Sequence, residues 1–258
     1  MSVATFWPML KKELYEQYRT YRVLIALVIF LLLGISAPIV TSLTPDLLKS
    51  LGNGIQITLP PQTATDALQS YIKQMSQLPA LMLILLAMGS VADERGRGTA
   101  VTVLTKPLPR SVFVLAKFLA YVLTLFVSML LAAVGAYYYT NQLFSAPPLT
   151  GFLLINLALF AFLTLILALT VLASVLFRNT VAAGGLAFGG FLVLAILPEL
   201  NGTIAQALPS ALFNPERVTQ LLAGTAPLGD TLRPIFIGFG LALGLIALAC
   251  IVFQYQEI

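Results

Sequence analysis

The sequence predicts an all-α, polytopic membrane protein with six transmembrane helices, an N-terminal amphipathic helix and both termini in the cytoplasm. Composition gives the class, because 59% of the 258 residues are hydrophobic and only 9% are charged. A soluble domain carries about 25% charged residues, so this much apolar surface cannot be hidden in one globular core. The long apolar runs and the distribution of Lys and Arg give the arrangement of the helices.

Six apolar runs reach, or nearly reach, the roughly 17–25 residues that a spanning helix needs. In order they cover residues 23–43, 78–92, 112–138, 152–177, 181–198 and 234–253. The second run is short by itself. A stripe at helical spacing leads straight into it, formed by Ala64, Leu68, Tyr71 and Met75. We therefore expect this helix to begin well before residue 78.

Basic residues predict the orientation, because Lys and Arg collect on the cytoplasmic side of membrane proteins. Ten of the 14 fall on the side of the N-terminus, and only Lys49, Lys73, Arg217 and Arg233 fall on the other. The ten acidic residues divide five and five, so Lys and Arg alone create the asymmetry. Both termini are then cytoplasmic, in a prokaryotic plasma or inner membrane. The net charge of +4 follows from this topology and does not indicate a nucleic-acid partner.

The N-terminal segment, residues 4–22, is predicted to form an amphipathic helix in the headgroup layer. Pro8 suits a first helical turn, and apolar side chains then recur at helical spacing: Trp7, Leu10, Leu14 and Tyr18. A simple positive anchor for the first span is an alternative that does not exclude this helix. A cleaved signal peptide is disfavoured, because the apolar run exceeds 7–15 residues and no small-x-small site follows it.

The membrane interior lacks the groups that several kinds of membrane protein require. The chain has no His, and the central parts of the last four spans carry no charge, which argues against proton-driven carriers. Histidine-ligated haem and His-dependent hydrolases are excluded as well. The lone Cys250 forms no intrachain disulfide or thiol metal site. Asn156 either lines a pathway or makes hydrogen bonds between helices.

A polar stretch of 18 residues, from Asp93 to Arg110, holds six of the chain's 24 charged residues. Its order predicts a short surface helix between two spans: Gly98 ends the preceding helix, Thr99 can cap a new one and Pro107 closes it. A helix held in this way moves only with its two spans, so it can transmit a push.

The run Glu94-Arg95-Gly96-Arg97-Gly98-Thr99, with Leu104, Pro107 and Arg110 behind it, resembles the loop between spans 2 and 3 of permeases of ATP-binding-cassette (ABC) transporters of the type-2 exporter class. In that family this loop carries a coupling helix that docks on the ATPase subunit. The resemblance assigns coupling to Asp93, Glu94, Arg95, Gly98, Thr99, Leu104, Pro107 and Arg110. Val101 stands where many members have an acidic residue.

The resemblance covers the whole chain and implies one permease domain, residues 1–258. It implies a cytoplasmic ABC ATPase partner that binds ATP and Mg, a second permease copy or a paralogue, and accessory extracytoplasmic proteins as further partners. The chain has no GxxxxGK[ST] motif, so we expect it to be no enzyme and to hold no cofactor. Export is the direction that the resemblance implies.

Two questions stay open from the sequence. A non-transporting membrane anchor or scaffold would use the same cytoplasmic features for static docking. The segment before the last span, residues 199–233, is either a plain outer loop or a set of short helices that dip back into the membrane, as in family members. Among substrates, a lipid-like or amphiphilic cargo is the preferred class.

Overall fold

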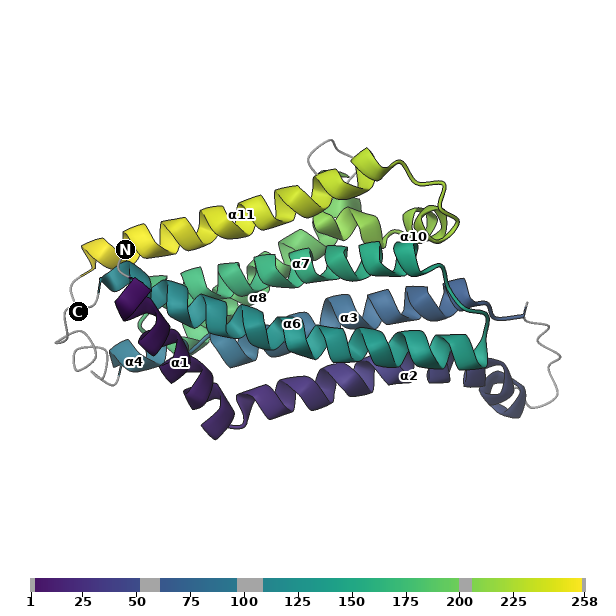
Figure 1. Cartoon of the computed structure of the whole chain (residues 1–258), viewed down its shortest axis with the longest axis horizontal. Helices are drawn as coiled ribbons and strands as arrows, with labels where there is room; N and C mark the ends of the chain where they lie inside the picture. The colour runs from purple at the N-terminus through teal and green to yellow at the C-terminus, as the bar shows by residue number, and fades with distance from the viewer. Residues whose placement is uncertain (1–2, 52–60, 97–108, 200–205, 257–258) are drawn as a thin grey trace.

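The computed structural model describes residues 3–51, 61–96, 109–199 and 206–256, and all regular structure in these ranges is helical. Figure 1 shows an elongated helical bundle, with α1 (Val3–Arg19) lying obliquely across one end. Within the described residues, five helices are long and apolar enough to cross a membrane. These five are α2 (Arg22–Leu51), α3 (Ala64–Ala87) with its continuation to Gly96, α6 (Arg110–Leu143), α7 (Leu149–Leu176) and α11 (Leu228–Tyr255).

The early start of the second span is confirmed, since α3 begins at Ala64. Thr63 and Asp66 form a capping box there, in which the Thr63 backbone N–H donates to Asp66 Oδ2 at 2.8 Å. Such a pair satisfies backbone N–H groups that the first turn leaves without partners. The last three residues of the stripe are fully buried, because Leu68, Tyr71 and Met75 are each 0% exposed.

Several helices are longer than the apolar runs that predicted them. The segment between the first two apolar runs, residues 44–77, is largely helical, because α2 continues to Leu51 and α3 begins at Ala64. The 34 residues of α6 extend about 51 Å at 1.5 Å per residue. A hydrocarbon core is only about 30 Å thick, so polar turns continue these helices beyond the apolar runs.

The fifth predicted span is the short one. α8 (Thr180–Ile196) has 17 residues, a length of about 25 Å, and a 3-10 turn, η1 (Leu197–Glu199), follows it. A tight turn precedes it, because α7 ends at Leu176 and α8 begins at Thr180. Asn179 caps α8, its Oδ1 accepting from the Val181 N–H at 2.8 Å.

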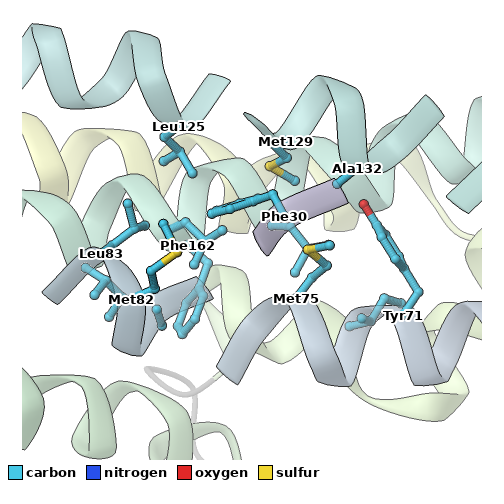
Figure 2. Close-up of a cluster of buried hydrophobic side chains, with 14 of the residues drawn as sticks. Phe30, Tyr71, Met75, Met82, Leu83, Leu125, Met129, Ala132 and Phe162 are labelled. Carbon is cyan, nitrogen blue, oxygen red and sulfur yellow. The ribbon is translucent and has the colours of Figure 1, made fainter. Parts of the chain in front are cut away.

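The core lies around α7, which packs against α3, α6, α8 and α11. Figure 2 shows the largest buried cluster, in which Phe30, Met75 and Phe162 interlock between α2, α3 and α7. Asn156 joins helices here, since the Tyr71 hydroxyl donates to its Oδ1 at 2.7 Å and its own Nδ2 donates to the Phe152 carbonyl. The hydrogen-bonding alternative for Asn156 is thus the one observed.

The segment before the last span contains short helices rather than a plain loop. After η1 come η2 (Pro209–Phe213) and α10 (Pro215–Leu222), at the end of the bundle opposite α1 (Figure 1). Asn214 caps α10 by accepting from the Glu216 N–H at 3.0 Å. These elements rest on α7 and α11, so the bundle has a folded cap at this end.

Candidate functional site

The described part of the predicted coupling loop begins in α4 (Ala92–Gly96), beside α1 at one end of the bundle (Figure 1). α3 stops at Ala87, and four residues in turn conformation separate it from α4. The buried Ser174 of α7 supports this break, because its hydroxyl oxygen accepts from the Val91 and Ala92 N–H groups at 2.9 and 3.0 Å. α7 therefore fixes the direction of α4 relative to α3.

An ionic cluster joins α4 to two other helices. Lys117 of α6 lies 2.6 Å from Glu94 Oε1 of α4 and 3.0 Å from Glu13 Oε2 of α1. The side chain of Lys117 is 3% exposed, that of Glu94 is 16% exposed and that of Glu13 is 5% exposed. Lys12 of α1 extends the cluster from the surface, at 3.0 Å from Glu13 and 3.6 Å from Glu94.

Charge balance explains why these ions tolerate burial. A buried ion stays charged at acceptable cost only when it is paired and hydrogen-bonded, and Lys117 has a carboxylate from each of two helices. Burial by itself would lower the pKa of Lys12, but the carboxylates of Glu13, Glu94 and Glu16 outweigh it and raise this pKa above its ordinary value. Lys12 therefore stays protonated at neutral pH.

The same carboxylates are spaced closely enough to hold a metal ion. Oxygen atoms of Glu13, Glu16 and Glu94 lie within 4.8 Å of one another. The ammonium groups of Lys12 and Lys117 already lie 2.6 to 3.6 Å from these oxygens and balance two of the three negative charges. The cluster is therefore suited to join helices.

Other predicted coupling residues connect the loop to the remaining helices. Asp93 Oδ1 accepts a hydrogen bond from the hydroxyl of Thr180, the first residue of α8. Arg95 Nη1 donates to the Val175 carbonyl of α7 at 2.8 Å. Arg110, the first residue of α6, donates to the Gln254 and Gln256 carbonyls at 3.0 and 2.8 Å, and so holds the end of α11.

The other four predicted coupling residues lie outside the described residues: Gly98, Thr99, Leu104 and Pro107. The structure brings Glu94 together with Glu13 and Lys117. Asp93 and Arg95 of α4 contact α8 and α7, respectively, and Arg110 is the first residue of α6. The described part of the loop thus contacts five helices.

The predicted N-terminal helix is present as α1, but it begins at Val3, so Pro8 lies in its second turn rather than its first. Of the predicted apolar residues, Leu10 is buried, Leu14 is partly buried, and Trp7 and Tyr18 are exposed. The placement of this helix in the headgroup layer stays a prediction.

The face of α1 that packs on the bundle contains polar residues as well as apolar ones. Glu13 and Gln17 are buried with Met9 and Leu10. Gln17 Oε1 accepts from the Thr124 hydroxyl of α6 at 2.7 Å. Hydrogen bonds and ion pairs therefore fix the position of α1 along α6. Beside it, α1, the α3–α4 turn and α6 border a cleft of about 380 Å³, lined in part by Gln17, Ser90 and the ionic cluster.

Sequence reasoning missed the central role of Lys117. The sequence predicted Lys117 only as one of the ten basic residues on the side of the N-terminus, but it is almost fully buried and bonded to buried carboxylates. The available signal was the presence of acidic residues close to the ends of spans on the Lys- and Arg-rich side: Glu13, Glu16, Asp93 and Glu94. Acidic residues there indicate partners for a buried cation.

Comparisons with known proteins match nearly the whole chain. The family model described as "ABC-2 family transporter protein" matches residues 7–258. An uncharacterized transmembrane protein of Bacillus subtilis (strain 168), YxlG, is 24% identical to the chain over 206 residues. That match covers 78% of this chain and 80% of the relative.

Proposed function

This chain belongs to the ABC-2 family of transporter proteins, and on that premise we propose that it is the membrane permease subunit of an ATP-driven exporter. In this proposal a separate cytoplasmic ATPase binds ATP and Mg and acts on the loop 93–110. The chain itself performs no chemistry. Its task is to convert movement of that loop into rearrangement of the spanning helices.

One observation carries the proposal: the described start of the loop is bonded to four separate helices within three consecutive residues. Asp93 binds α8, Glu94 binds α1 and α6, and Arg95 binds α7. A loop that only linked two spans would need none of these contacts. Displacement of α4 must therefore move, or break bonds to, helices on several sides of the bundle.

The ionic cluster supplies two alternative arrangements for such a movement. Lys117 bridges Glu13 and Glu94 in this structure, and Lys12 lies close enough to either carboxylate to replace it. The adjacent cleft of about 380 Å³ gives α1 and α4 room to shift. An ATPase that bonds differently to the loop in its two nucleotide states would bias these arrangements.

The proposed topology has six spans with both termini in the cytoplasm. The beginning of α1 and the end of α11 lie at the same end of the bundle (Figure 1), which supports an even number of crossings. In this proposal α8 crosses as the sixth span, although its length of about 25 Å falls short of the usual core. A short span is accommodated by local thinning of the bilayer or by association with another helix.

We further propose that two permease chains pair, as homodimer or with a paralogue, and enclose the pathway between them. The exposed side of α8 supports this: a Cβ added at Gly185 or Gly189 would meet no atom within 4 Å. Small residues on an exposed face let a second helix approach closely. Rearrangement of α2, α3 and α8 would then open and close the pathway at the interface.

The test compares the ATPase subunit alone with the same subunit assembled with this chain in nanodiscs. We expect assembly to change the rate of ATP hydrolysis, and Glu94→Ala/Arg95→Ala to restore the rate of the free subunit while the complex still assembles. Lys73→Ala is the matched control, since Lys73 is an exposed cation of α3 on the opposite side of the predicted membrane.

Two results would contradict the proposal. A double variant with the wild-type ATPase rate and transport would remove the coupling role of the loop. A complex without any protein that hydrolyses nucleotide, or an ATPase indifferent to this chain, would favour the static anchor or scaffold instead.

A further inference from the structure

A second cleft, of about 370 Å³, is bordered by η2 and α10, which lie at the end of the bundle opposite α1 (Figure 1). Its lining is divided by chemistry. Buried rings and aliphatic groups line one part, among them Phe162, Phe191 and Leu212, whereas the charged side chains of Glu216, Arg217 and Asp230 line another. Nothing in the proposed coupling uses this cleft.

The apolar wall is held in a fixed shape. The Phe162 ring packs edge-on against the Phe213 ring, with 5.4 Å between the ring centroids, and tilted against the Phe191 ring, with 6.4 Å between the centroids. η2 is pressed onto α11, because a Cβ at Gly238 would lie 2.3 Å from Pro209 Cγ. The Ser210 hydroxyl donates to the Leu194 carbonyl at 2.9 Å and ties η2 to α8.

α10 is held just as closely. A Cβ at Gly151 of α7 would lie 2.5 Å from the Leu221 carbonyl oxygen, so only glycine permits this approach. Asn214 caps the helix and fixes its first turn, which carries Glu216 and Arg217. The charged part of the cleft is therefore attached to a rigid element rather than to a loose loop.

The charges on this lining are available to a ligand. Within the residues that the structure describes, Glu216, Arg217 and Asp230 form no ion pair with one another or with any other side chain. Glu216 and Asp230 are exposed and Arg217 is partly exposed. Two carboxylates and one guanidinium beside an aromatic wall offer binding partners for both charges of a zwitterion and for an apolar chain.

We propose that this cleft binds a zwitterionic amphiphile of the phosphocholine or phosphoethanolamine type. The acyl chain lies against Phe162, Phe191 and Phe213, the phosphate faces Arg217, and the ammonium group faces Glu216 and Asp230. A volume of about 370 Å³ is at the small end of ligand sites, which span about 300–1,000 Å³. It suits one chain segment with its headgroup and leaves a second chain in the bilayer.

This assignment rests on the proposed function only in naming a class of cargo, because binding needs neither ATP nor the ATPase. The experiment uses the full chain in nanodiscs without any partner. The probe is lysophosphatidylcholine with a photoreactive diazirine in its acyl chain, and mass spectrometry locates the crosslinks. Lysophosphatidylglycerol with the same chain is the anionic comparison.

We expect saturable crosslinks at peptides of α7, α8 and η2 that line the cleft, with a stronger signal from the choline probe. Ala195→Trp, which fills the cleft, should abolish them, and Ala182→Trp on the exposed cytoplasmic part of α8 should not. Asp230→Asn should weaken only the choline probe. Arg217→Gln should weaken both about three- to tenfold, the loss expected of one charge-assisted hydrogen bond at a partly exposed site.

Crosslinks spread evenly over the lipid-facing helices, or unchanged by Ala195→Trp, would overturn the site. Equal or stronger labelling by the anionic probe would overturn the zwitterionic class. Neither result bears on coupling, which is measured by ATP hydrolysis, so the two proposals fail separately.

Discussion

Replacing Lys117 with methionine tests whether the buried ionic cluster holds α1, α4 and α6 together. Methionine keeps much of the side-chain volume and removes the charge, which leaves the carboxylates of Glu13 and Glu94 close together without the ion that bridges them at 3.0 and 2.6 Å. We expect a large loss of stability and weaker docking of α1 on the bundle.

The magnitude follows from the distances and the burial. At an effective dielectric constant of about 20, each contact contributes about 5 to 6 kcal/mol of gross Coulomb attraction, but withdrawing each ion from water costs several kcal/mol. Removing one partner of such a group typically costs about 3 to 5 kcal/mol. Lys12, already 3.0 Å from Glu13, can compensate in part, so we expect about 3 kcal/mol.

Thermal unfolding of the purified chain measures this effect. At about 2 to 4 °C per kcal/mol for a domain of this size, Lys117→Met should lower Tm by about 6 to 12 °C. Lys12→Met is the matched control, because it removes the same charge from the same carboxylates at a side chain that is 42% exposed. Exposed pairs contribute about 0 to 1 kcal/mol, so its Tm should fall by less than about 4 °C.

A neutral triad separates the loss of charge balance from the loss of a packed side chain. Combining Lys117→Met with Glu13→Gln and Glu94→Gln removes all three ions together, and replacement of a whole buried ion group is often neutral or stabilising. Tm should then return close to the wild-type value. Equal Tm values for Lys117→Met and Lys12→Met, or a neutral triad as unstable as the single variant, would refute the argument.

Three further substitutions test contacts elsewhere in the bundle. Ser174→Ala removes the acceptor of two buried N–H groups at the α3–α4 turn and should lower the free energy of unfolding by about 1–3 kcal/mol. Amide hydrogen exchange in this turn should become faster. Thr170→Val loses only a bond within its own helix and should leave this exchange unchanged. Gly34→Ala should lower Tm more than Gly135→Ala, since a Cβ at Gly34 would lie 2.5 Å from a backbone oxygen of α6 and one at Gly135 meets a flexible side chain at 3.0 Å; equal shifts would contradict the packing. Tyr71→Phe loses one interhelical hydrogen bond and should cost about 1 kcal/mol in chemical unfolding, and no change would show that this bond contributes nothing.

Local pattern predicted most of the helices, because each spanning helix must supply its own apolar length and its own backbone hydrogen bonds. The start of α3 at Ala64 followed from a stripe of four residues. Helix ends were less predictable, because α2 and α6 continue as ordinary polar helix beyond the apolar runs. The short helices η2 and α10 depend on close contacts with α7 and α11, and no local sequence pattern contains such contacts.

Charge position was predictable, but pairing was not. The sequence predicted Glu94 in the loop after the second span and Lys117 near the start of the third, and the structure has both residues at these places. Glu13 and Lys117 are separated by 104 positions, so only the folded chain shows that they meet. The inward face of α1 was missed for the same reason, since Glu13 and Gln17 are buried only because partners on α6 receive them.

The exposed indole of α1 has a practical use. Trp7 is the only tryptophan in the chain, and it is 65% exposed on the helix that the ionic cluster fastens to the bundle. Excitation at wavelengths that only tryptophan absorbs therefore produces fluorescence from one known position. A blue shift on addition of lipid or of an ATPase, and its loss in Lys117→Met, would report the movement of this helix without any attached label.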